Sequence, residues 1–155
     1  MSSPPSGSEA RSSSFERLHP GVQRWIWNRG WSELREVQER AIPHVLARED
    51  LLVAAPTAGG KTEAIFLPIA SSLASEAAGA RGLGCLCVSP LKALINDQLV
   101  RLEEIFEAVQ IPVFGWHGDI SQSRKNKALQ ADSGVLLITP ESLEALFVRR
   151  GPRMA

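Results

Sequence analysis

The sequence has no net charge, only two cysteines and no long apolar run. Its 17 basic and 17 acidic residues cancel, so the chain as a whole creates no field that attracts polyanions, and a phosphate or nucleic-acid site must be local. A membrane span needs about 18 or more consecutive apolar residues, and none is present. The first 14 residues lack the apolar core of a signal peptide. We therefore expect a cytoplasmic protein with no membrane partner.

The two cysteines, Cys85 and Cys87, lie two residues apart in an apolar run. In a strand, both side chains would point to the same face. A zinc site normally needs several ligands, and the sequence offers no second Cys/His pair with zinc-like spacing. Reduced thiols packed in the core are therefore the favoured interpretation.

The chain divides into a polar N-terminal segment and a longer part with enough apolar residues for a core. Residues 1–14 are rich in Ser, Pro and Gly, and their few apolar groups cannot offset the entropy of ordering, so we predict a disordered tail. The pattern over residues 15–155 predicts one domain. It begins with two helices, one that starts near Pro20 and ends at Gly30, and one around residues 34–49.

After these helices, a short apolar run is followed four times by a longer amphipathic run. The predicted strands span residues 51–55, 85–89, 112–117 and 134–139. The helices that follow them span residues 61–78, 91–109, 121–130 and 141–150. Strands that are apolar throughout are typical of a sheet covered on both faces, and alternation with helices is typical of parallel crossovers. The predicted fold class is α/β with a doubly wound parallel sheet, whose strand ends should face one ligand cleft.

The stretch "APTAGGKT", from Ala55 to Thr62, lies between the first predicted strand and its helix. A turn at this place exposes successive N–H groups and the positive end of the helix dipole, and glycines let the backbone close around phosphate oxygens. Lys61 would contact the β and γ phosphates, and the Thr62 hydroxyl would ligate Mg²⁺. The phosphate-loop pattern is met except that Ala55 replaces its first glycine. A chance Gly-Lys pair is the alternative, which the strand before the turn and the helix after it disfavour.

This stretch resembles motif I of the superfamily 2 helicases, and the other predicted strand ends agree with the same family. "SPLKALINDQ" at residues 89–98 resembles motif Ia, "WHGD" at 116–119 the short motif after it, and "TPESL" at 139–143 motif Ib. With "LREVQERAI" at the Q-motif position, the set is most similar to the Lhr-like (large helicase-related) branch of the DEAD/DEAH-box helicases, over about residues 15–148. Ala58 stands where the family usually has glycine, which leaves open whether Ala58 or Gly59 supplies the permissive backbone conformation.

The resemblance implies that residues 15–155 are the N-terminal part of a first RecA-like lobe, which binds ATP and Mg²⁺. Gln38 would read adenine with its carboxamide, and Trp31 or Arg35 would stack on the base. The alternatives are a helix-surface glutamine and a tryptophan that packs helices. The implied nucleotide-binding residues are Arg35, Gln38, Ala55, Pro56, Thr57, Ala58, Gly59, Gly60, Lys61, Thr62 and Glu63, with Lys61 and Thr62 in the catalytic roles.

The resemblance also implies that motifs Ia and Ib contact the sugar-phosphate backbone of single-stranded or duplex DNA or RNA. Such contacts carry no base information. The implied residues are Pro90, Lys92, His117, Gly118, Thr139, Pro140 and Glu141. If the resemblance is set aside, Lys92 is interpreted as a solvated lysine at the start of a helix. His117 has no nucleophile beside it in the sequence, so we interpret it as a positioning residue.

In this family, a D-E-x-H or D-E-A-D segment after motif Ib supplies two groups that ATP hydrolysis needs, a carboxylate that binds magnesium and a residue that orients the attacking water. No Asp-Glu pair follows Thr139, and the sequence contains no second lobe. We expect the intact protein to be an ATP-dependent helicase, and this chain, without the C-terminal helicase lobe, to bind without turnover. The alternative is a non-hydrolysing remnant that binds nucleotide or nucleic acid. A P-loop kinase is disfavoured because no arginine-rich lid is present.

Overall fold

The computed structural model describes residues 13–56, 58–76 and 82–150. Its helices are α1 (Ser13–Glu16), α2 (Pro20–Asn28), α3 (Glu36–Leu46), α4 (Lys61–Glu76), α5 (Lys92–Glu107), α6 (Gln122–Gln130) and α7 (Pro140–Arg150). Its strands are β1 (Cys85–Val88), β2 (Val113–Trp116) and β3 (Val135–Ile138). Across this part of the chain, no helix has the length and apolar character that a membrane crossing requires.

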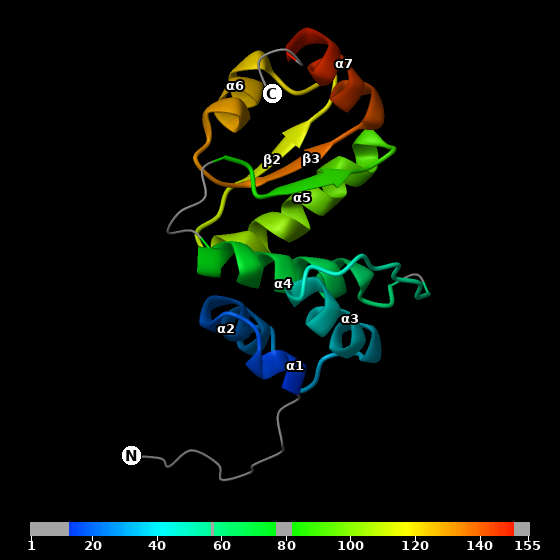
Figure 1. Cartoon of the computed structure of the whole chain (residues 1–155), viewed down its shortest axis with the longest axis vertical. Coiled ribbons are helices and arrows are strands. Elements are labelled where there is room, and N and C mark those ends of the chain that lie inside the picture. Colours follow the sequence, from blue (N-terminus) through cyan, green and yellow to red (C-terminus); the bar gives the residue numbers. More distant parts are fainter. Residues whose placement is uncertain (1–12, 57, 77–81, 151–155) are drawn as a thin grey trace.

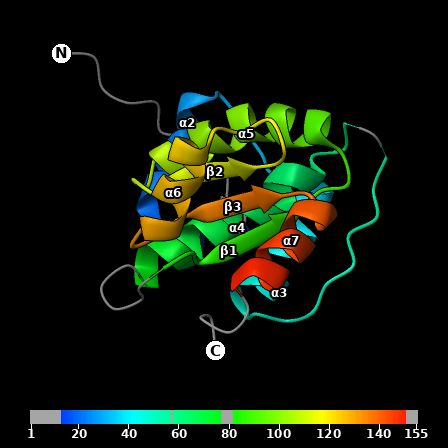
Figure 2. The same ribbon diagram turned by 90° about the horizontal axis from the view of Figure 1, so that it is seen from above.

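The three strands form one parallel sheet in the order β1-β3-β2. Cys85 and Val113 both align with Val135, so the two outer strands share one register with the central strand. Figure 1 shows α6 and α7 on one side of the sheet and α4 and α5 on the other. The view from above shows β3 between its two neighbours (Figure 2). The predicted doubly wound parallel sheet is confirmed.

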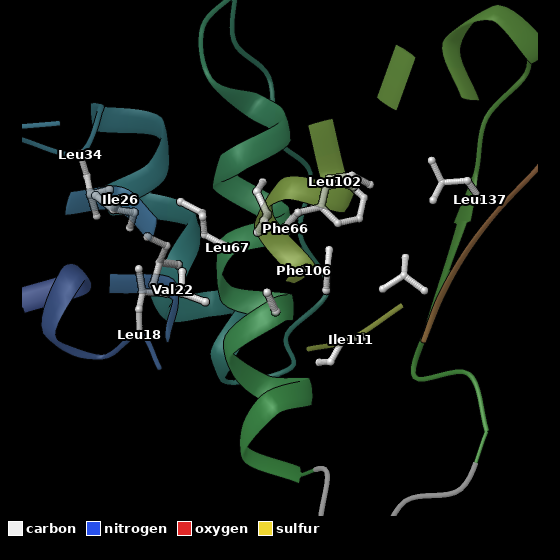
Figure 3. Close-up of a cluster of buried hydrophobic side chains, with 14 of the residues drawn as sticks. Leu18, Val22, Ile26, Leu34, Phe66, Leu67, Leu102, Phe106, Ile111 and Leu137 are labelled. Atoms are coloured by element: carbon white, nitrogen blue, oxygen red, sulfur yellow. The ribbon is translucent and has the colours of Figure 1, made fainter. Parts of the chain in front are cut away.

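The central strand β3 joins two hydrophobic cores, because all four of its residues are buried. Val135 and Leu137 belong to the larger core with residues of α2, α4 and α5, whereas Leu136 and Ile138 pack with α6 and α7. In the larger core, side chains of α2, α4 and α5 meet (Figure 3), and the rings of Phe66 and Phe106 lie edge to face. The helix α4 therefore lies between the N-terminal helices and the sheet (Figure 1).

The first of the two predicted N-terminal helices is formed as expected. Pro20 is the first residue of α2, where its missing N–H is not needed. The Nδ1 atom of His19 accepts a hydrogen bond from the N–H of Gly21 at 3.1 Å and caps this end. Gly30 follows the helix with a φ of 69°, a conformation that favours glycine.

The expected strand over residues 51–55 is wrong, because this segment has no regular secondary structure and joins no sheet. The side chain of Leu52 is 94% exposed. A strand is stabilised by ladder hydrogen bonds and by packing against neighbours, and the described residues place no strand beside this segment. Its apolar composition alone therefore does not make it a strand.

The expectation that both faces of every strand are covered is also wrong for β1. Leu86 and Val88 are 51% and 48% exposed. They align with Leu136 and Ile138 of β3, whose shared face is covered by α6 and α7. These two helices pack over β2 and β3 and leave the same face of β1 open.

The structure begins inside the segment that the sequence assigns to the tail. Ser13 and Ser14 belong to α1, and Ser14 is buried. Its hydroxyl donates a hydrogen bond to the carbonyl oxygen of Glu39 at 3.0 Å, which offsets the loss of hydration. Residues 1–12 of the predicted tail lie outside the described residues.

Cys85 and Cys87 are half-buried free thiols that pack against the larger core, which confirms the predicted packing. Burial raises the pKa of the Cys85 thiol to about 11, and the charge of the neighbouring Cys87 adds to this effect. Burial also raises the pKa of Cys87. Both thiols are therefore protonated and poorly nucleophilic at neutral pH.

We predict that iodoacetamide modifies Cys85 slowly in the folded chain, because a pKa raised from 9.0 to about 11 lowers its thiolate fraction. Mass spectrometry should show the folded-state rate rising as the pH passes from 9.0 toward about 11. Burial favours the protonated thiol, so the stability that Cys85 contributes to the fold is fully present below the pKa of the thiol in the unfolded chain. This stability is lost as the pH rises through the pKa of the thiol in the folded chain. The chain unfolded in urea is the control, and equal folded and unfolded rates at neutral pH would contradict the prediction.

Candidate nucleotide-binding site

The loop before α4 has the backbone conformation of a tight turn that only certain residues can adopt without strain. Gly60 has a φ of 85° and Ala58 a φ of 60°, whereas Gly59 does not have a positive φ. A Cβ atom on Gly59 would lie 2.8 Å from the carbonyl oxygen of Pro56, so glycine is needed there for space. Ala58 therefore adopts the left-handed conformation itself, which resolves the alternative between Ala58 and Gly59. Thr57 lies outside the described residues.

The first turn of α3 holds this loop in place. Gln38 is only 1% exposed, and its Oε1 atom accepts a hydrogen bond from the N–H of Arg35 at 2.9 Å. Its Nε2 atom donates a hydrogen bond to the carbonyl oxygen of Gly60 at 3.5 Å. The guanidinium of Arg35 donates a hydrogen bond to the carbonyl oxygen of Ala58. A Cβ atom on Gly60 would lie 2.8 Å from Nε2 of Gln38. The two Q-motif side chains and the loop thus form one hydrogen-bonded unit.

Lys61 is the first residue of α4, and its ammonium group lies against its own loop. The Nζ atom donates to the carbonyl oxygens of Ala55 at 2.5 Å and Pro56 at 2.9 Å. These contacts hold the positive charge beside the N-terminus of a 16-residue helix, where the helix dipole also favours an anion. A phosphate oxygen is a stronger partner for an ammonium group than a neutral carbonyl, so it can replace these contacts.

A cavity of about 440 Å³ opens in front of the loop. Of the expected nucleotide-binding residues, Arg35, Gln38 and residues 58–63 line it. Ala55 and Pro56 line a neighbouring hollow between the loop and α3. Thr62, the expected magnesium ligand, lies on the cavity wall, and the described residues contain no group of three or more His, Cys, Asp or Glu that could hold a metal.

The cavity also has walls that the sequence did not indicate, from α2 and α5. They carry Trp25, Arg29, Arg101, Glu104 and Ile105. No motif marks these residues, and only the tryptophan spacing hinted at a packed aromatic group. They lie up to about 50 positions from the loop in the sequence, so only the tertiary fold brings them to the same cavity.

Aromatic rings and ion pairs shape the outer part of this cavity. Trp31 also lines it and meets Trp25 edge to face, with ring centroids 5.6 Å apart. The Arg29 guanidinium lies 4.9 Å from the centroid of the Trp25 ring and pairs with Glu104. Trp31 therefore both packs against a helix and borders the cavity, so the structure is compatible with each of its two interpretations.

The expected nucleic-acid residues lie after the carboxyl ends of the three strands. Lys92 pairs with Asp119 through contacts of 3.2 Å to both carboxylate oxygens. His117 is 3% exposed, and its Nε2 atom lies 3.1 Å from Oδ1 of Asn96 while Nδ1 accepts from the N–H of Asp119 at 3.3 Å. Gly118 is exposed beside Lys92. His117 thus shapes the loop after β2 and ties it to α5.

Thr139 caps the helix after β3. Its hydroxyl donates to Oγ of Ser142 at 3.0 Å and accepts from the N–H of Ser142 at 3.4 Å. Thr139 is buried, whereas Pro140 and Glu141 are exposed in the first turn of α7. Pro90, after β1, is also exposed. The side chain of Thr139 is therefore engaged within the protein, which leaves backbone groups as the available donors at this helix start.

Comparison with known proteins assigns the chain to a family. The sequence matches the family described as DEAD/DEAH box helicase over residues 35–154. The chain therefore belongs to the DEAD/DEAH box helicases, as the motifs predicted.

Curated relatives include two helicases that match most of this chain. The ATP-dependent helicase Lhr-Core of Methanothermobacter thermautotrophicus is 32% identical over 145 residues, which cover 84% of this chain and 17% of that protein. The uncharacterized ATP-dependent helicase YprA of Bacillus subtilis is 29% identical over 135 residues, which cover 86% of this chain and 17% of that protein. The chain thus spans about a sixth of the length of these relatives.

Solved structures agree with the fold. The DUF1998 helicase MrfA bound to DNA superposes with a TM-score of 0.76 at 28% identity, covering 88% of this chain and 19% of that one. The RNA helicase Prp28 from Chaetomium thermophilum bound to ADP gives a TM-score of 0.77 over 97% of this chain and 37% of that one. At 24% identity, this second likeness concerns the fold alone. The expected RecA-like helicase fold is confirmed.

We predict that Ala58→Gly raises the free energy of unfolding by about 0.5–1 kcal/mol, because glycine removes the strain of a left-handed alanine but adds freedom to the unfolded chain. Gly59→Ala is the matched control and should lower it by more than about 1 kcal/mol, because the added methyl group meets a backbone oxygen. Urea unfolding followed by circular dichroism measures both. A destabilised Ala58→Gly variant would contradict the conformation assigned to this position.

Proposed function

We propose that this chain is the nucleotide-binding part of a helicase motor that binds ATP with Mg²⁺ and, in the intact protein, couples hydrolysis to movement along a nucleic-acid strand. The observation that carries the proposal is the loop before α4, with Lys61 at the helix start and Gln38 and Arg35 clamped to the loop's backbone. A helix N-terminus with a permissive loop and one cation is suited to a polyphosphate. The match to the helicase family supports the same conclusion.

The residues present fit ATP. Gly59 and Gly60 line the cavity without a side chain, so the backbone there can approach phosphate oxygens. Lys61 would bind the phosphates as a point charge, and Thr62 would hold Mg²⁺ through its hydroxyl. Bound ATP with its metal would supply the phosphoryl group that is hydrolysed. Gln38 would read adenine with its carboxamide, and Trp31 or Arg35 would stack on the base.

We assign nucleotide binding to the loop before α4 and the cavity in front of it. Hydrolysis by the intact protein would also need a carboxylate that anchors magnesium and charges that stabilise the transferring phosphoryl group, which the family resemblance assigns to a D-E-x-H segment and to a second lobe. A cytoplasmic location is part of the proposal, because both cysteines are free thiols.

The nucleic-acid partner would lie along the strand ends. The exposed positions there are Pro90, Lys92, Gly118, Pro140 and Glu141. Backbone N–H groups at the start of α7 and the ammonium of Lys92 can donate to phosphates, whereas His117 and Thr139 would act by shaping their loops. Backbone contacts of this kind suit DNA or RNA.

We predict that Lys61→Ala weakens binding of Mg-ATP by at least about tenfold, because one charge-assisted hydrogen bond contributes about 1.5–3 kcal/mol. Isothermal titration calorimetry on the folded chain measures the dissociation constant. Lys127→Ala, which removes an exposed lysine of α6, is the matched control and should bind as the wild type does. Equal affinity of the wild type and Lys61→Ala would rule out the phosphate-loop assignment.

We predict that Gln38→Ala narrows the preference for ATP over GTP. The variant also loses contacts to Arg35 and Gly60, so both affinities should fall, and the ratio of the two dissociation constants is the diagnostic quantity. Arg40→Ala, which alters an exposed side chain of the same helix, is the control and should keep the ratio. If Gln38→Ala keeps the full preference, adenine is read by other residues.

A further inference from the structure

A carboxylate lies where the proposed site has to accept a polyanion. Glu63 is the third residue of α4, two positions after Lys61, and its side chain is 11% exposed. Glu63 lines the same cavity as Lys61 and Thr62. A carboxylate in the first turn of a helix is favoured by the dipole, but in a partly desolvated cavity it repels a phosphate group. Nucleotide binding therefore requires that the charge of Glu63 be compensated.

The lysine of the loop does not compensate this charge. The ammonium of Lys61 is directed to the carbonyl oxygens of Ala55 and Pro56. The cation that contacts Glu63, among the described residues, is Arg101 of α5, whose Nη2 atom lies 2.5 Å from Oε1 of the carboxylate. Arg101 is half exposed at the cavity wall, whereas its partner is nearly buried.

We propose that Arg101 is a positioning residue for nucleotide binding, which holds the Glu63 carboxylate and neutralises it so that the first turn of α4 can accept the phosphates. This inference rests on the proposed function and adds a residue from α5 to the phosphate end of the site. With Arg101 in place the net charge of the Arg101–Glu63 pair is zero, which leaves Lys61, Arg35 and the helix N-terminus to determine the local potential. Arg101 then acts through Glu63 and needs no contact with the nucleotide.

The number of phosphate groups that reach the loop distinguishes this role from a structural one. If Arg101 cancels the charge of Glu63, its loss should weaken the binding of nucleotides whose β and γ phosphates would occupy the loop beside Glu63 more than the binding of AMP, which lacks those phosphates. A general loosening of the cavity would weaken ATP, ADP and AMP alike. A direct contact between Arg101 and the nucleotide would be lost in every variant that lacks the guanidinium, whether or not Glu63 is present.

The experiment compares four variants by calorimetry with Mg-ATP, Mg-ADP and AMP at low ionic strength. We expect Arg101→Gln to weaken Mg-ATP about tenfold and AMP no more than about twofold. Arg101→Lys, which keeps the charge, should bind nearly as the wild type does. The double variant Glu63→Gln/Arg101→Gln should return to within about threefold of the wild type, because it removes both charges. The family resemblance implies that Glu63 takes part in nucleotide binding, whereas this inference makes it a charge that opposes binding, so Glu63→Gln alone should bind Mg-ATP at least as tightly as the wild type.

The matched control is Arg48→Gln, which breaks the Arg48–Glu76 pair at the other end of α4. It should leave nucleotide affinity unchanged. Circular dichroism checks folding, and if Arg101→Gln does not fold, Glu63→Gln and the double variant decide the question. Weaker Mg-ATP binding by Glu63→Gln, or a double variant no better than Arg101→Gln, would overturn the inference. A wild-type chain that binds no Mg-ATP would instead overturn the proposed function.

Discussion

The burial of α4 is the constraint on which the other features of this structure depend. Ala64, Leu67 and Ala70 are fully buried, because the helix has the N-terminal helices on one side and α5 with the sheet on the other. A helix packed on both sides can neither rotate nor slide without opening two contacts. Its first residue, Lys61, is therefore fixed in space, and so is the loop that enters it. The contact with α3 also brings Gln38 against Gly60, so one packing arrangement sets both sides of the cavity.

The chain has no net charge, so the positive potential that a polyanion needs has to be produced locally in the cavity. Four of the cavity's charged wall residues occur as pairs, Arg29 with Glu104 and Arg101 with Glu63. Paired side chains create little net potential, so the potential at the loop comes from Lys61, from the Arg35 guanidinium and from the amide groups of α4. A chain without overall charge can hold a polyanion in this way, because the attraction acts over a few ångströms and only at one helix end.

Much of the fold could be predicted from the sequence, because apolar periodicity and the glycine-lysine turn are local signals. The helices after each strand and the three strands from Cys85 onward occur close to their expected positions. The segment at residues 51–55 was wrongly predicted as a strand, because a strand depends on neighbours that its own composition does not reveal. Arg101 and Glu104 were missed for a related reason, since their role exists only once α5 packs beside α4. The family motifs located the loop but not the ion pairs around it.

The three strands differ in how far helices and neighbouring strands cover them, so the sheet opens to solvent more easily at one edge than at its centre. Strand β3 has hydrogen-bonded neighbours on both sides and a helix layer on both faces, so its amide groups are reached only when the whole sheet separates. Strand β1 has a neighbour only at β3 among the described strands, and its residues Leu86 and Val88 are half exposed. Local opening of this sheet therefore starts at β1, where separating the strand costs less free energy than at the centre of the sheet. Among the described residues, protection against hydrogen exchange should accordingly rise from β1 toward β3.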